Sequence, residues 1–167
     1  LDRNTSGIII GAKNSAALRI INEKIRSREI KKIYLCIVEG HLKKSGHLTA
    51  YLTRGDKKVT VSDYNEENSK KIGTKYNVIA EKKDTSLVEV ELETGRTHQI
   101  RVHMSSIGHP LLGDDVYGSG KSPFNLCGQT LHAGVLGFIH PTTKEYVEYS
   151  ADLPEYFQKV ISRLRNS

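Results

Sequence analysis

The chain has 167 residues, of which 37% are hydrophobic and 26% charged, which is typical of one folded domain and excludes a largely disordered protein. Lysine and arginine outnumber aspartate and glutamate by 25 to 19, and the net charge of +6 favours a polyanionic partner such as nucleic acid. Cys36 and Cys127 lack paired spacing and no apolar run approaches the ~20 residues of a membrane span, so we expect a reducing, cytoplasmic setting.

The amino end combines a polar loop with two predicted elements. We expect Ile8–Ile10 to form a short buried strand and Asn14 to cap an amphipathic helix. Asp2 then lies just before a strand, where a turn role and a catalytic role are both open from the loop alone. The helix would direct four apolar side chains to the core: Ala17, Leu18, Ile21 and Ile25.

The middle of the chain predicts a sheet. Residues 33–38 are apolar except for Tyr34 and Cys36, which is typical of a central strand buried on both faces. A tyrosine at the start of such a strand is most often a core residue. Three alternating runs then predict an antiparallel meander over residues 48–53, 58–63 and 75–81.

A strand, a turn and a helix are predicted over residues 87–107. Apolar and acidic residues alternate from Leu87 to Glu93, and Gly95 ends this strand. Thr97 can cap a helix that runs to about Ile107. Polar side chains gather here against apolar stripes, and buried polar groups need partners. We expect Asp2 to be the partner of Arg101.

The carboxyl end predicts a hairpin and a final helix. The hairpin strands cover residues 131–139 and 145–149, and Asp152 with Glu155 is typical of a capping box. The whole pattern favours an α+β fold with a mixed, mostly antiparallel sheet flanked by helices.

Neither a metal nor a cofactor is expected. His98 and His103 are five residues apart, which places them on different faces of a helix, unlike paired zinc ligands. A nucleophile elbow and the glycine-rich loops that bind nucleotides are also missing from the sequence.

Five motifs carry a resemblance to a known family. They are LDRNTSG at residues 1–7, Lys32-Ile33-Tyr34, TGRTHQIRVH at 94–103, LLGDDVYG at 111–118 and Leu131-His132-Ala133. In this order and spacing they resemble the catalytic domain of RluA-type pseudouridine synthases, over essentially the whole chain. The resemblance implies that RNA is the partner and that uridine is isomerised to pseudouridine without a cofactor. Ribosomal RNA is the favoured substrate and tRNA the second.

The resemblance also implies roles for particular residues. Asp2 is similar to the catalytic aspartate, Arg101 to the arginine that pairs with it, and Tyr34 to the tyrosine that stacks on the target base. The residues expected to bind substrate are Arg3, Thr5, Arg96, His98, Gln99 and Leu131. A non-catalytic RNA-binding module on the same scaffold is the alternative, and it would need basic residues but no carboxylate.

Residues 1–167 are expected to form a single pseudouridine synthase catalytic domain that is truncated at its amino end. The family motif normally begins with His-Arg before the Leu-Asp, whereas this sequence begins at Leu1.

Overall fold

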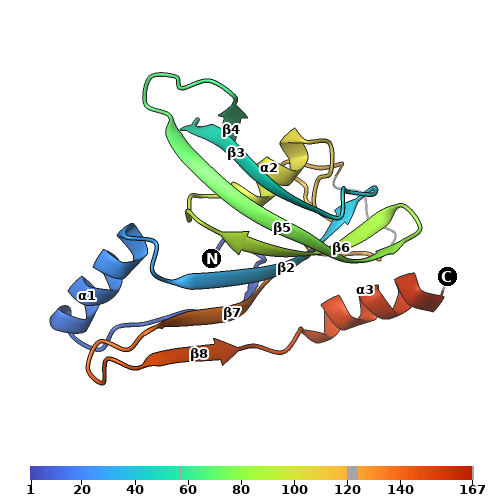
Figure 1. The fold of residues 1–167 in the computed structure, drawn as a ribbon. Coiled ribbons are helices and arrows are strands. Elements are labelled where there is room, and N and C mark those ends of the chain that lie inside the picture. The colour runs from blue at the N-terminus through green and yellow to red at the C-terminus, as the bar shows by residue number, and fades with distance from the viewer. Residues whose placement is uncertain (57, 120–123, 167) are drawn as a thin grey trace.

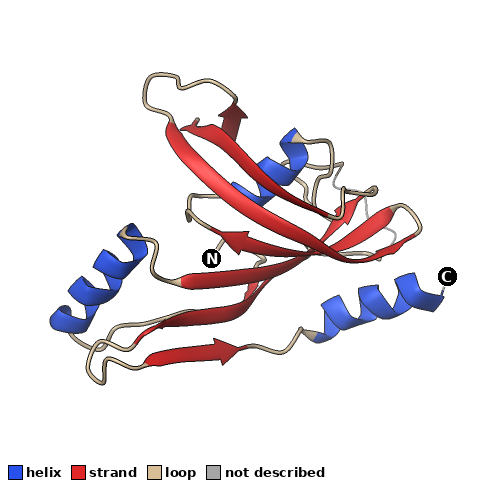
Figure 2. Cartoon of the chain, viewed as in Figure 1, coloured by secondary structure: helices blue, strands red, loops and turns tan. Residues whose placement is uncertain are grey.

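The fold is a mixed sheet with helices packed on it, as described by a computed structural model for residues 1–56, 58–119 and 124–166 (Figure 1, Figure 2). The strands of these residues are β1 (Ser6–Gly7), β2 (Lys31–Glu39), β3 (Ser45–Arg54), β4 (Val59–Ser62), β5 (Lys70–Lys82), β6 (Thr85–Leu92), β7 (Leu131–Ile139) and β8 (Tyr146–Ser150). The helices are α1 (Ser15–Arg26), α2 (Gln99–Ser106) and α3 (Glu155–Asn166). No helix in these ranges is long and apolar enough to cross a bilayer. The predicted α+β class is confirmed.

The strands follow the order β1-β7-β2-β6-β5-β3-β4, with β8 also paired to β7. β1 runs parallel to β7, and the other pairings are antiparallel. β1 therefore brings the residues just after Asp2 against β7, although 126 positions separate Ser6 from its partner His132.

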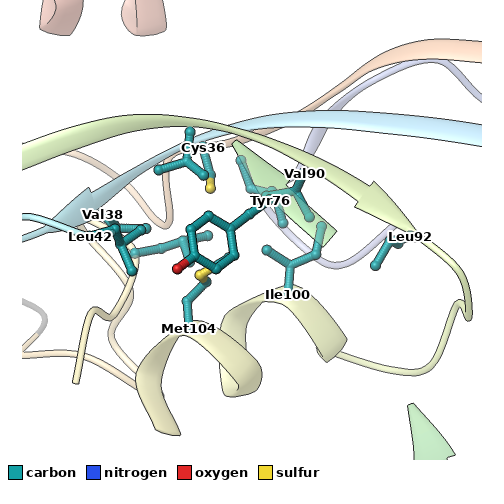
Figure 3. Packing of buried hydrophobic residues seen from close by; sticks show 11 residues of the cluster. Cys36, Val38, Leu42, Tyr76, Val90, Leu92, Ile100 and Met104 are labelled. Carbon is teal, nitrogen blue, oxygen red and sulfur yellow. The ribbon is translucent and has the colours of Figure 1, made fainter. Parts of the chain in front are cut away.

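The core lies on both faces of β2, because side chains alternate along a strand. Cys36 and Val38 pack in a cluster with Ile100 and Met104 of α2 (Figure 3). Ile37 points to the opposite face, where it packs against Phe157 of α3 and its neighbours. These side chains are almost completely buried, and each contributes about 1.5–3 kcal/mol by leaving water. The second half of β2 is thus buried on both faces, as predicted.

The helix α1 begins where the sequence predicts, since the Asn14 side chain accepts a hydrogen bond of 2.8 Å from the N–H of Ala17. Ile21 is buried against Phe138 of β7. Leu18 and Ile25, however, are 49% and 44% exposed, so their predicted core position is wrong. The reason is that α1 touches the sheet along one narrow row, and Ile21 is its one buried residue.

The predicted strand at Ile8–Ile10 is also misplaced. The strand is Ser6–Gly7, and Ile9 is 77% exposed. A Cβ at Gly7 would collide with the backbone of Ala133, and its φ of +117° is one that side chains rarely adopt. The glycine therefore decides where the chain can approach β7.

Two predicted helix caps are wrong for local reasons. Thr97 does not cap α2, because the N–H of Gln99 donates to the carbonyl of Arg96 and the capping position is held by His98, which has a φ of +54° and no side-chain cap bond. Asp152 does not cap α3, because the first turn is formed by the carbonyl of Pro154, which accepts hydrogen bonds from the N–H groups of Phe157 and Gln158.

Candidate active site

A cavity of about 400 Å³ is lined by residues of the amino terminus and of the end of β6. Figure 1 shows the amino terminus beside the end of this strand. Its polar wall contains Asp2, Thr5, Arg96 and Gln99, and its apolar wall includes Tyr34. The remaining lining residues are Leu1, Leu92, Gly95, Thr97, Ile100 and Leu131. The volume falls in the range of small-molecule sites in proteins. Six residues that the sequence predicts as site residues thus share one cavity, although they come from four separate segments.

The loop that carries Asp2 is held in a fixed turn. The N–H of Thr5 donates to the carbonyl of Asp2 at 3.0 Å, and Asn4 adopts a φ of +66° between them. Gln129 is 2% exposed, and its side-chain NH₂ donates to the carbonyl of Arg3 at 2.7 Å and to the hydroxyl of Thr5 at 3.1 Å. The Asn4 side chain donates to the carbonyl of Cys127 at 3.0 Å. These bonds tie the loop that carries Asp2 to the segment just before β7.

His132 secures the strand that follows this loop. Its Nε2 lies 3.1 Å from the carbonyl of Ala151, and a carbonyl can only accept, so Nε2 carries the hydrogen. Its Nδ1 forms a hydrogen bond of 2.8 Å with the hydroxyl of Ser6. This buried contact lies one residue beyond Thr5 and limits the motion of the loop.

Arg101 lies behind the cavity, 3% exposed, between two carboxylates. Its Nη1 is 3.8 Å from Oδ2 of Asp2, which is an ion pair without a close hydrogen bond. Its Nε and Nη2 donate to the two oxygens of Asp114 at 2.7 and 2.9 Å. The predicted proximity of Arg101 and Asp2 is present in the structure. The hydrogen-bonded partner of the arginine, however, is Asp114, which was not predicted from the sequence.

Asp114 is 1% exposed and fully engaged. Besides Arg101, its Oδ1 accepts from the N–H groups of Val116 and Tyr117, both at 3.0 Å. Burial alone would raise the pKa of Asp114, but the hydrogen bonds from Arg101 and from these N–H groups outweigh it and lower the pKa below the ordinary 3.8. For Arg101, burial opposes the charge, and the contact with Asp114, followed by the charge of Asp2, raises its pKa.

Tyr117 covers the same arginine from another side. The Cζ atom of Arg101 lies 5.2 Å from the centre of the Tyr117 ring, a cation–π distance. The Tyr117 hydroxyl accepts from the N–H of Val59 at 3.0 Å and lies 2.9 Å from Nδ1 of His98. His98, predicted to bind substrate, is thus engaged with Tyr117 and does not line the cavity. Arg3 does not line it either, and contributes its carbonyl to Gln129.

Tyr34 supplies the aromatic face of the cavity and is half-buried at the start of β2. Burial and the charge of Asp2 both raise the pKa of Tyr34, which keeps the phenol neutral. A neutral ring beside a carboxylate offers a flat base a stacking surface.

Gln99 lines the cavity, but its amide is already occupied. Its NH₂ donates to the carbonyl of Gly73 and the hydroxyl of Thr74, both at 3.0 Å. Its Oε1 accepts from the hydroxyl of Thr94 at 2.8 Å and from the N–H of Arg96 at 3.1 Å. Gln99 therefore ties the turn before α2 to β5, and with it the position of Arg96.

His103, a buried histidine of α2, does not line this cavity. His103 is 2% exposed and its Nδ1 lies 2.9 Å from the hydroxyl of Thr74. Burial, with a smaller effect of His47, lowers the pKa of His103 to about 4, so the ring is neutral at pH 7. Among the residues that the structure describes, no three His, Cys, Asp or Glu side chains are grouped so that they could hold a metal ion.

Comparison with known proteins agrees with the geometry. Residues 1–106 match the RNA pseudouridylate synthase family. The chain is 43% identical to an uncharacterized RNA pseudouridine synthase, YlyB, of Bacillus subtilis, over 100% of this chain and 55% of that protein. It is 40% identical to ribosomal large subunit pseudouridine synthase D of Zymomonas mobilis, over 98% of this chain and 54% of that protein. The chain thus spans about half the length of these relatives.

Solved structures show the same fold. Human RNA pseudouridylate synthase domain containing 4 superposes with a TM-score of 0.81 at 24% identity, over 99% of this chain and 74% of that chain. Human RNA pseudouridylate synthase domain containing 1 has a TM-score of 0.72 at 27% identity, over 93% of this chain and 74% of that chain.

Proposed function

The chain belongs to the RNA pseudouridylate synthase family, and we propose that it carries the catalytic site that converts uridine to pseudouridine in structured RNA. The observation that carries the proposal is the arrangement of three side chains. Asp2 stands in the cavity beside the ring of Tyr34, and the Arg101 guanidinium lies 3.8 Å behind its carboxylate.

This arrangement suits an isomerisation that needs no external reagent. The bond between N1 of uracil and C1′ of the ribose breaks, the base turns, and a bond between C5 and C1′ forms, while C5 loses its hydrogen and N1 gains one. Asp2 would either attack the nucleotide or remove a sugar proton, and both routes use a carboxylate held in a defined orientation. Arg101 supplies that orientation because Asp114 fixes two of its three nitrogens.

Tyr34 would hold the base during this change. A base must leave its stack before its glycosidic bond can be reached, and an aromatic ring stabilises the extruded base. Stacking contributes about 1–3 kcal/mol per base and tolerates rotation in the plane of the ring. Leu131, 3% exposed, would form the apolar wall beside the base.

Ribosomal RNA is the substrate that we propose. One relative at 40% identity is named a ribosomal large subunit pseudouridine synthase, and the net charge of +6 favours a polyanion. We also propose that the protein acts in the cytoplasm, where it would meet ribosomal RNA.

The test is Asp2→Asn, with Asp84→Asn in the exposed turn between β5 and β6 as a control that loses the same charge. Release of tritium from RNA that contains 5-tritiated uridine measures the reaction, because C5 loses its hydrogen. We expect Asp2→Asn to abolish release while RNA affinity falls less than about tenfold, since most RNA affinity comes from basic residues. Arg101 keeps its bonds to Asp114, so the variant should fold.

Two results would contradict the proposal. If Asp2→Asn converts uridine at a rate near that of the natural sequence, Asp2 is not the catalytic carboxylate. If the natural sequence binds RNA and releases no tritium from any uridine-containing RNA, the scaffold is a non-catalytic RNA-binding module.

A further inference from the structure

Lys32 is a half-buried cation at the edge of the cavity. It precedes Tyr34 by two residues on β2, so both side chains leave the same face of the strand. Its Nζ lies against Gly95, where a Cβ would come within 3.2 Å of the ammonium. Gly95 and the adjacent Arg96 line the cavity that holds Asp2. The Lys32 ammonium therefore lies next to the cavity, because Gly95 has no side chain that would separate the two.

No anion within the described residues neutralises Lys32. No carboxylate there lies within 4.0 Å of its Nζ, and no hydrogen bond from it is formed. Its neighbour Lys31, on the other face of β2, pairs with Glu148 at 3.0 Å. Burial lowers the pKa of Lys32, because the ammonium gives up water. An unpaired charge that is partly removed from water is a cost to the folded state.

We propose that Lys32, with Arg96, forms a phosphate-binding site for the RNA backbone at the mouth of the cavity. The inference rests on the proposed function and adds the contact that holds the phosphodiester next to the extruded uridine. A lysine ammonium suits a phosphate as a compact point charge with three donors. The exposed Arg96, next along the chain from Gly95, supplies a second cation. The phosphate provides the negative charge that the described residues do not offer to Lys32.

The experiment compares Lys32→Met and Lys32→Arg with Lys43→Met. Lys43 is an exposed lysine beyond the far end of β2. Lys43→Met removes the same charge as Lys32→Met and therefore serves as its control. The probe is a fluorescein-labelled, single-stranded oligouridylate of about 12 nucleotides, with affinity measured by anisotropy between about 50 and 300 mM KCl. Each phosphate neutralised on a single strand contributes roughly 0.7 to the slope of log affinity against log salt.

We expect Lys32→Met to lower that slope by about 0.7 and affinity by about threefold or more at 100 mM KCl. Lys32→Arg should keep the slope, and Lys43→Met should change it by less than about a third of that amount. Lys32→Met should also unfold at the same temperature as the natural sequence or a higher one, because it removes an unpaired charge. A residue with a merely structural role would lower the unfolding temperature instead.

The site is refuted if Lys32→Met keeps the natural slope, if Lys43→Met lowers it equally, or if Lys32→Met unfolds at a clearly lower temperature. Any of these results with uridine conversion intact refutes the phosphate site alone. Failure of the natural sequence to bind the oligouridylate at any salt concentration would contradict the proposed function as well.

Discussion

Asp114→Asn tests whether the buried ion pair positions Arg101, the residue that we propose orients Asp2. The substitution keeps the size of the side chain and one acceptor oxygen, but removes the charge opposite Arg101. The two groups are 1% and 3% exposed and are joined by hydrogen bonds of 2.7 and 2.9 Å. Removing one partner of such a pair leaves the other charge buried, which typically costs about 3–5 kcal/mol.

Two features of the site bring the expected loss in the free energy of unfolding to the lower end of that range. Asp2 remains 3.8 Å from the guanidinium and compensates for part of the lost charge. The carbonyl oxygen of an asparagine can still accept from the N–H groups of Val116 and Tyr117. We therefore expect the free energy of unfolding to fall by about 3 kcal/mol at pH 7. Asp115→Asn changes an exposed neighbour with the same charge and should cost less than about 0.5 kcal/mol.

The free energy of unfolding that Asp114→Asn loses should be largest near neutral pH and smaller in acid. The pKa of Asp114 is lower in the folded protein than its ordinary 3.8, so the unfolded chain binds the proton more readily. The stabilisation is then complete well above pH 3.8 and is lost as the pH falls below that value towards the folded pKa. The difference between the natural sequence and Asp114→Asn should accordingly be constant from about pH 5 to 7 and shrink in stronger acid.

Urea unfolding followed by far-ultraviolet circular dichroism measures these differences, and it suits a chain without tryptophan. A double-mutant cycle with Arg101→Met should show that the second substitution costs much less once the first is present. A loss below about 1 kcal/mol at pH 7, or an equal loss for Asp115→Asn, would refute the argument that this ion pair holds Arg101. Uridine conversion should fall with Asp114→Asn through a lower kcat, because Arg101 no longer orients Asp2.

Two further changes test the cavity and its support. Tyr34→Ala should weaken RNA binding about 5- to 100-fold, whereas Tyr34→Phe should stay within about threefold, because stacking needs the ring and not the hydroxyl; equal affinity of both variants by anisotropy would contradict a stacking role. Gly7→Ala should lower the free energy of unfolding by about 3 kcal/mol, because a Cβ would meet the backbone of Ala133 at a positive φ. Gly11→Ala is its matched control, because no heavy atom of the described residues beyond Gly11 and its chain neighbours lies within 4 Å of the added carbon, and it should be close to neutral in the same urea unfolding assay.

Much of the architecture could be predicted from local pattern. The alternation of apolar and acidic residues over 87–92 and the apolar run at 33–38 predict strands that the structure contains as β6 and β2. These patterns predict strands correctly because each one depends only on which side of its own strand faces the core. The five motifs also predict which residues gather at the cavity, and six of the nine named residues line it.

The errors have a common cause in packing that local pattern does not report. Leu18 and Ile25 have the right spacing for the core face of α1, but whether they are covered depends on how far the sheet extends beneath the helix. The misplaced strand at Ile8–Ile10 is similar, because the close approach to β7 is possible only at Gly7.

The partner of Arg101 was beyond the reach of the sequence. Asp114 and Asp115 are adjacent and chemically identical, yet one is 1% exposed and accepts from Arg101 while the other faces solvent. Gln129 supports the Asp2 loop across 124 residues of chain, where no periodicity connects the two. Local patterns record the environment of a single element, whereas the pairing of polar groups depends on how separate elements stack. The sheet order and the core around β2 decide how these elements stack. They place Asp114 against Arg101 and leave Asp2 in the cavity.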